Sequence, residues 1–206
     1  VAVTAAGALQ ATGLGTSTIT ATRGGQSATV TINVSPASPA VLKHRYSFDG
    51  PANSTSVLDS VGAQNGEIKP PFPTAGVPNP SPVIQTNGQA LFPSGTAWDS
   101  AGYIDLPNGL ISSKTNITIE TWVTWNGPNN NASQNWSRIF DFGDSSKGED
   151  AQFAGNGSGR SYIFITPRAN GNTLRVEAIP AGGAAMQLNR SPSIAVGQET
   201  HLVLVY

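Results

Sequence analysis

The sequence predicts an all-β protein whose short antiparallel strands form a β-sandwich of the jelly-roll type. Apolar and polar residues alternate with a period of two in most segments, and none carries an apolar stripe with helical spacing. The 23 Gly and 15 Pro among 206 residues supply frequent turns between these segments. Strands of this length and spacing are typical of antiparallel sandwiches and jelly rolls.

The first 36 residues are expected to be the end of a separate domain. Two alternating runs in GLGTSTITATRGGQSATVTINVSP flank a Gly-Gly turn, which predicts a β-hairpin. A lone hairpin is marginal in water, so further strands must complete it. The stretch resembles the closing hairpin of a bacterial immunoglobulin-like domain of group 2, a family common in extracellular stalks.

A short linker is predicted after this fragment. SPASPA spans residues 35 to 40, and its prolines fix the backbone and resist regular strand pairing. We therefore place the immunoglobulin-like fragment at 1–36, a Pro/Ser linker at 37–42 and a second domain at 43–206. The chain begins without methionine and ends inside the apolar run HLVLVY, which predicts a piece of a longer polypeptide.

Motifs in the second domain follow a recognisable order. They are RYSFDG, VLDSVGAQNGEI, GYIDLPNGLISSKTNITIETWVTW and RIFDFGD. Together they resemble the laminin-G-like, concanavalin A-like lectin/glucanase domains of bacterial secreted proteins. The resemblance implies a jelly roll from about Arg45 to Tyr206, with several more strands after HLVLVY. The domain is therefore expected to be truncated, with open sheet edges.

The amino-acid composition limits the classes of partner that we expect for this chain. The formal net charge is −1 and no cluster of Lys and Arg occurs, so neither nucleic acid nor an anionic membrane is expected as a partner. No apolar run approaches the roughly 20 residues needed to cross a bilayer. The absence of cysteine excludes disulfides and thiolate chemistry. A cysteine-free chain rich in Asn, Thr and Gly suits a secreted or cell-surface bacterial protein.

Acidic side chains in glycine-rich loops are candidates for a calcium site. Asp49 and Asp59 offer the hard oxygen ligands that Ca²⁺ prefers. The jelly-roll resemblance also implies one structural or ligand-bridging Ca²⁺. The alternative is that both residues cap turns by accepting hydrogen bonds from the backbone.

A carbohydrate-binding surface is predicted from aromatic and arginine side chains on strands or adjoining loops. Flat aromatic rings suit the C–H faces of sugars, and guanidinium groups suit their hydroxyls. The candidates are Trp122, Trp136, Arg138, Tyr162 and Arg168. Each aromatic could instead cover a neighbouring strand.

The strand at residues 115–125 shows how alternation separates its two tryptophans. Trp125 shares a side with Ile119 and Val123, so we expect it in the core. Trp122 lies on the other, polar side beside Glu120, where the sequence leaves its environment open.

Catalysis is not expected. A glycosidase needs two carboxylates, and Glu120 has no acidic partner on its own strand, although Asp141 could approach from a neighbouring one. We therefore expect a non-catalytic extracellular module that binds a polysaccharide or glycan within a larger bacterial protein. Two alternatives stay open. One is a structural or adhesive spacer, or a protein-interaction module, and the other is part of a glycosidase or polysaccharide lyase.

Overall fold

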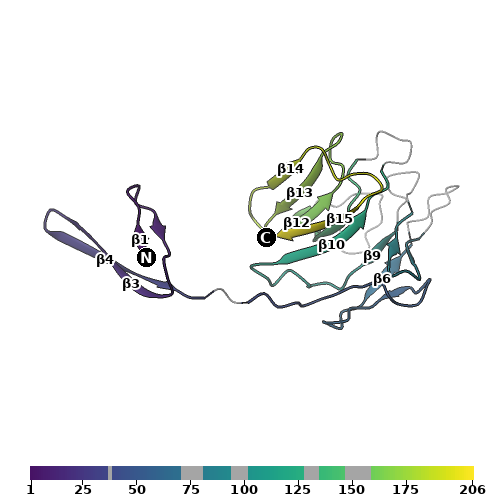
Figure 1. The fold of residues 1–206 in the computed structure, drawn as a ribbon, viewed down its shortest axis with the longest axis horizontal. Coiled ribbons are helices and arrows are strands. Elements are labelled where there is room, and N and C mark those ends of the chain that lie inside the picture. The colour runs from purple at the N-terminus through teal and green to yellow at the C-terminus, as the bar shows by residue number, and fades with distance from the viewer. Residues whose placement is uncertain (37–38, 71–80, 94–101, 128–134, 147–158) are drawn as a thin grey trace. The chain divides into compact units, whose positions relative to one another are not determined.

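The computed structural model describes residues 1–36, 39–70, 81–93, 102–127, 135–146 and 159–206 (Figure 1). Within these residues the regular structure consists of β-strands without a helix, and every strand pair is antiparallel. The all-β prediction is confirmed at this level. The chain divides into two compact units, Val1–Lys43 and His44–Tyr206, which are described separately.

The first unit contains the predicted hairpin. Its strands are β1 (Ala2–Val3), β2 (Leu9–Gln10), β3 (Gly15–Arg23) and β4 (Gln26–Val34). Arg23 pairs with Gln26 across Gly24 and Gly25, which both have positive φ, as a two-residue hairpin turn requires. Threonines pair across one side of the ribbon, which lies largely exposed.

One part of the second unit is built from short strands around a small core. These strands are β5 (Ser56–Val57), β6 (Gly66–Lys69), β7 (Val83–Ile84), β8 (Ala90–Leu91) and β9 (Tyr103–Asp105). β5, β6 and β9 form one sheet, and β7 pairs with β8. Val57, Ile68 and Ile84 are buried together, so each short strand contributes to a common apolar cluster.

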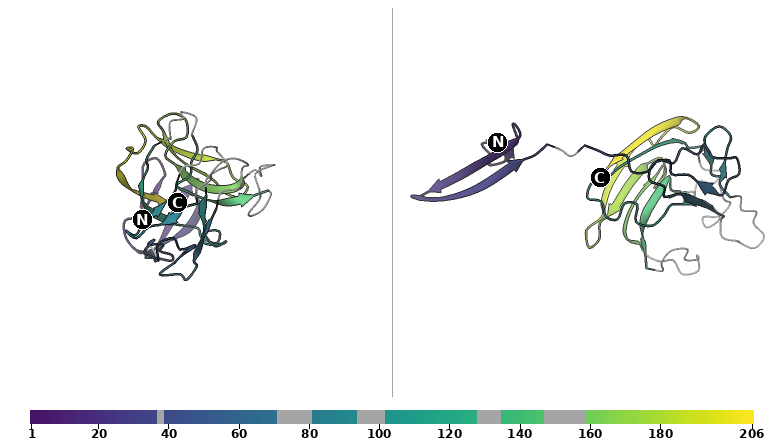
Figure 2. Two further views of the ribbon diagram at one scale, coloured as in Figure 1. Left: turned by 90° about the vertical axis from the view of Figure 1, so that its right-hand side faces the viewer. Right: turned by 90° about the horizontal axis from the view of Figure 1, so that it is seen from below.

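The other part of the second unit contains longer strands in two sheets. β10 (Thr118–Thr124) pairs with β15 (Glu199–Val205). The second sheet has the order β11 (Phe140–Ser145), β12 (Gly159–Thr166), β13 (Leu174–Ile179) and β14 (Met186–Arg190). Figures 1 and 2 show these four strands side by side.

The two sheets pack against each other through one apolar cluster. Ile165, Leu174 and Ile194 are buried at its centre, and Val123 of β10 and Leu202 of β15 pack against them. Successive side chains of a strand point to opposite sides, so polar residues of both sheets point away from this cluster. Trp125 also packs against this cluster, which confirms its predicted place on the apolar side.

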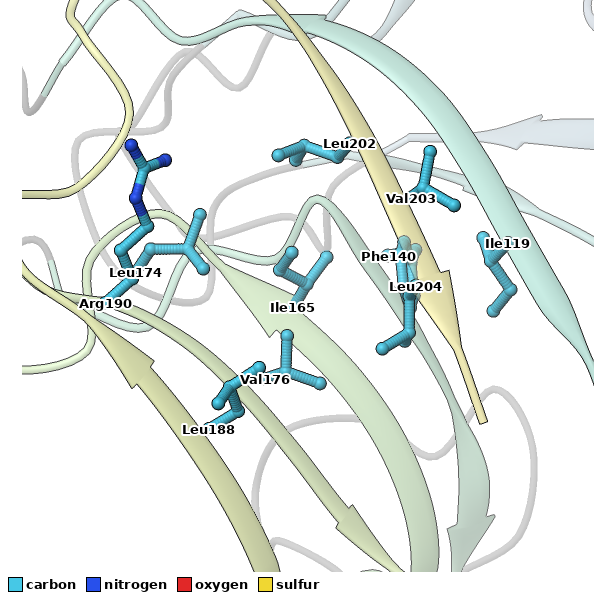
Figure 3. Close-up of a pocket in the computed structure, with 10 residues that line it drawn as sticks. All are labelled: Ile119, Phe140, Ile165, Leu174, Val176, Leu188, Arg190, Leu202, Val203 and Leu204. Atoms are coloured by element: carbon cyan, nitrogen blue, oxygen red, sulfur yellow. The ribbon is translucent and has the colours of Figure 1, made fainter.

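A cavity of about 170 Å³ lies between the two sheets (Figure 3). Leu202 and Leu204 of β15 line one side of it, and Ile165 and Leu174 line the other. Arg190, on β14, is the charged residue among the lining side chains. In the described part of the chain, β14 pairs only with β13 and β15 only with β10, so both have one open edge.

Candidate functional site

The outward side of the four-stranded sheet carries a row of polar and aromatic residues. Asp141, Phe164, Glu177 and Gln187 are register partners on the four successive strands. On β12, Phe164 shares its side with Tyr162, whereas Ile165 points the other way into the apolar cluster. Strand alternation therefore places this row on the side opposite the core.

Phe164 is the buried centre of the row, with 4% of its surface exposed. The Arg138 guanidinium covers it, with the Cζ atom 3.7 Å from the ring centroid. Tyr162 stacks beside it at 5.6 Å, and the Trp136 ring meets it edge-on at 6.4 Å. These spacings are typical of favourable aromatic and cation–π contacts. Three of the five predicted ligand-binding residues therefore gather around one phenylalanine.

Hydrogen bonds fix Arg138 over the ring. Its Nε donates to Asp141 Oδ2 at 3.0 Å, and its Nη1 donates to the Trp136 carbonyl at 2.7 Å. Burial raises the pKa of Asp141 above its usual value, although the Arg138 hydrogen bond and charge act in the opposite direction. Solvent still reaches 45% of the Asp141 side chain, so this carboxylate is accessible to a ligand.

Trp136 is held in an unusual backbone conformation. Its φ of +72° lies in the left-handed region, which is strained for a bulky residue and often marks functional sites. Its N–H donates to the Arg168 carbonyl at 2.7 Å. Arg175 and Arg138 lie 5.1 and 5.8 Å from the ring centroid, yet 38% of the residue remains exposed.

Glu177 contacts three other side chains of the same surface. Its Oε1 accepts a 2.6 Å hydrogen bond from the Tyr162 hydroxyl, and its Oε2 accepts one of 2.8 Å from Gln187. Arg175 forms an ion pair with Oε2 at 3.6 Å. The hydrogen bond to Glu177, with burial and the Glu177 charge, raises the pKa of Tyr162.

Gly143 and Arg168 lie at the margins of the site. Gly143 lies opposite Tyr162 on β11, and a Cβ atom there would lie only 2.7 Å from the Tyr162 Cβ. Arg168 donates from Nε to Asn135 Oδ1 at 2.9 Å. The predicted residue Arg168 therefore adjoins the cluster through the segment that carries Trp136.

Trp122 is placed elsewhere. It projects from β10 on the side away from the apolar cluster, with 60% of its surface exposed. Its ring stacks on His201 of β15 with the centroids 4.3 Å apart and an angle of 13° between the planes. His201 Nε2 lies 2.7 Å from Glu120 Oε1. The five predicted residues therefore do not form one site.

The predicted calcium ligands differ in their surroundings. Asp59 is buried, and its Oδ1 accepts hydrogen bonds from the N–H groups of Arg45, Val61 and Gly62. Its Oδ2 accepts from the Gln64 N–H and from His44 Nδ1. Five donors on two oxygens match the turn-capping alternative and do not fit a calcium ligand.

The electrostatics of Asp59 agree with that reading. Burial alone would raise its pKa, but the backbone hydrogen bonds and His44 outweigh it and hold the pKa well below its usual range. Asp49 is exposed, and no group of three or more His, Asp or Glu side chains suited to a metal occurs among the described residues. Calcium therefore stays a prediction that these residues do not support.

Sequence reasoning missed five members of the two clusters. Four of them, Phe164, Arg175, Glu177 and Gln187, lie on the outward side of the four-stranded sheet, and His201 joins Trp122. The alternation in SYIFIT could have paired Phe164 with Tyr162 on one side of a strand. The others depend on cross-strand register, which the sequence does not state.

No family model matches the chain, and no curated protein or solved structure matches it. The resemblances to laminin-G-like and immunoglobulin-like domains therefore remain predictions from the motifs. Among the described residues, no helix is long and apolar enough to span a membrane.

Proposed function

We propose that the unit His44–Tyr206 is a non-catalytic carbohydrate-binding module of a secreted or surface protein, with a jelly-roll fold related to laminin-G-like domains. Its binding surface is the outward side of β11–β14 around Trp136, Arg138 and Tyr162, which we call the Trp136 face. The observation that carries the proposal is the partly exposed Trp136 ring, which a left-handed backbone conformation holds beside two arginines and edge-on to Phe164.

The chemistry of the Trp136 face suits a sugar ring. The accessible part of the indole offers an apolar surface for C–H groups, while Asp141 and Arg138 at its edge offer an acceptor and donors for hydroxyls. These side chains are already fixed by hydrogen bonds, so little conformational entropy is lost on binding. A weak single-site affinity is sufficient for a module tethered to a larger protein.

The same contacts favour binding over hydrolysis. Asp141 and Glu177 flank Phe164 in one cross-strand row, and a glycosidase would need a sugar between two such carboxylates. Arg138 covers Phe164 in that intervening position, and both Glu177 oxygens accept hydrogen bonds. Glu177 is thus engaged in hydrogen bonds and Asp141 is paired with Arg138, which favours a role for both carboxylates in binding rather than in activating water.

Affinity electrophoresis of the whole chain tests the proposal. Gels containing hydroxyethylcellulose, xylan, galactomannan, pectin or alginate would be compared with a gel free of polysaccharide. We expect at least one polymer to retard the protein. Trp136→Ala should weaken the affinity measured by that retardation by roughly two- to tenfold, because one aromatic contact contributes about 0.5 to 1.5 kcal/mol.

Trp136→Tyr is the matched control, because it keeps an aromatic face in the same place. It should retain most of the retardation, and circular dichroism should show that both variants are folded. Unchanged mobility of the wild-type chain in all five polymers would contradict the proposal and favour a spacer. Equal retardation of Trp136→Ala and wild type would move the binding surface elsewhere.

A further inference from the structure

A second cluster of polar and aromatic side chains lies apart from the Trp136 face. It consists of Trp122 and Glu120 on β10 and His201 on β15, and we call it the Trp122 face. Trp122 and His201 are direct register partners, so their rings start from adjacent backbone positions. Glu120 lies two residues before Trp122, on the same side of β10.

The Trp122 ring is exposed but makes a defined contact with His201. His201 covers one side of it in a nearly parallel stack at 4.3 Å, and Glu120 fixes the imidazole through its Nε2 at 2.7 Å. With 60% of the residue exposed, the indole still presents apolar surface to solvent. A large exposed ring that is stacked on one side by a histidine and open on the other is an arrangement that favours stacking with a flat partner.

Hydrogen-bonding capacity remains beside the ring. Within the described residues, His201 Nδ1 and Glu120 Oε2 have no hydrogen-bond partner. Glu199 is the other charged residue on this side of the two strands, and it pairs with Thr124 in the register. A sugar ring on the indole would therefore find donors and acceptors for its hydroxyls within one strand spacing.

The Trp122 face and the Trp136 face lie on opposite sides of the two packed sheets. Trp122 points away from the apolar cluster on β10, and Phe164 points away from it on β12. Packed sheets are about 10 Å apart, so no single sugar ring can contact both surfaces. Any ligand of the Trp122 face must be a second sugar residue or a second chain.

We propose that the unit is bivalent, with the Trp122 face binding a second glycan chain and the module thereby cross-linking polysaccharide. This inference rests on the proposed function, because both surfaces are taken to bind the same polymer. It adds a separate site with its own residues, Trp122, His201 and Glu120. Two weak sites on opposite sides join polymer chains without requiring a protein dimer.

Light scattering of the whole chain mixed with the polymer that retards it in affinity electrophoresis tests bivalency. Wild type should raise the scattering as polymer chains become cross-linked. Trp122→Ala should abolish at least nine tenths of that rise while still being retarded in the gel through the Trp136 face. Trp122→Tyr, which keeps an aromatic ring at this position, should restore most of it.

Each outcome separates the two proposals. Cross-linking by Trp122→Ala equal to wild type overturns bivalency but leaves the proposed function standing. If none of the five polymers retards the wild-type protein, both proposals are overturned. Size-exclusion chromatography with light scattering completes the test, because a wild-type dimer that Trp122→Ala converts to a monomer would make the Trp122 face a self-association surface and overturn the inference.

Discussion

Asp59 and Asp141 are the same residue type in opposite settings within one unit. Asp59 is buried and accepts five hydrogen bonds, three from the loop that follows it and two from His44 and Arg45. Asp141 is partly exposed and binds one arginine that covers an aromatic ring. The pKa of Asp59 is lowered, whereas that of Asp141 is raised. A saturated, buried carboxylate fixes a loop, while an accessible one beside aromatics can serve a ligand.

The largest effect is expected for Asp59→Asn. An amide has the same shape, but its NH₂ group would face N–H donors, so buried backbone groups would lose their acceptor. We expect the melting temperature to fall by on the order of 10 °C, or the unit not to fold. Differential scanning calorimetry measures this. Asp49→Asn is the matched control and should change little, since Asp49 is exposed.

Core packing gives the next largest effect and separates the two tryptophans of one strand. Trp125 packs against the apolar cluster, so Trp125→Ala should lower the free energy of unfolding by about 3 kcal/mol. Trp122→Ala removes an exposed ring and should lower it by less than about 1 kcal/mol. Urea unfolding of both variants measures the difference. Equal losses would contradict the assignment of the two sides of β10.

That pair also shows how much the sequence could predict. Alternation within one strand assigned Trp125 to the core and set Trp122 on the other side, because successive side chains point in opposite directions. Alternation does not say which strands share a sheet. Trp136 and Tyr162 both contact Phe164, whereas Trp122 lies apart from them, and this depends on the long-range pairing of β10 with β15 and of β11 with β12.

The sequence could predict that Asp59 accepts hydrogen bonds in a turn, but it could not predict which groups donate them. Aspartate often caps turns, and the sequence offered that role as the alternative to calcium. Four of the five donors are backbone N–H groups of residues 45 to 64 and the fifth is the His44 side chain, and their convergence depends on how the chain folds back between these residues. The resemblance to laminin-G-like domains implied calcium instead, and that stays a prediction.

The two aspartates should respond to pH with opposite signs. The pKa of Asp59 is lower in the folded state than the unfolded value of about 3.9, so its stabilisation is complete above that pH. The stabilisation is lost as the pH falls through the folded pKa. The stability difference between wild type and Asp59→Asn, measured by thermal melting, should therefore shrink as the pH falls below about 4.

For Asp141 the folded pKa is higher than the unfolded one, so its ionisation opposes folding as the pH rises through that interval. Asp141→Asn should then lose less stability at pH 7 than at pH 4, both measured by thermal melting. A difference that grows with pH would contradict the raised pKa. The effect should be smaller than for Asp59, because solvent reaches 45% of the Asp141 side chain.

The smallest effect concerns the hydroxyl of Tyr162 on the Trp136 face. Glu177 accepts its hydrogen bond and raises its pKa, so Glu177→Gln should move that pKa back toward the usual value near 10. Ultraviolet absorbance of phenolate during an alkaline titration measures the shift. Tyr162→Phe identifies the signal by removing it, and should lower the free energy of unfolding by only about 1 kcal/mol.

Tyr46 is the control for this titration. Burial and the charge of Asp59 raise the pKa of Tyr46 to about 12. This pKa should be unchanged in Glu177→Gln, because the partners of Tyr46 lie in the Asp59 network. A shift of both tyrosines would mean that the two networks are coupled.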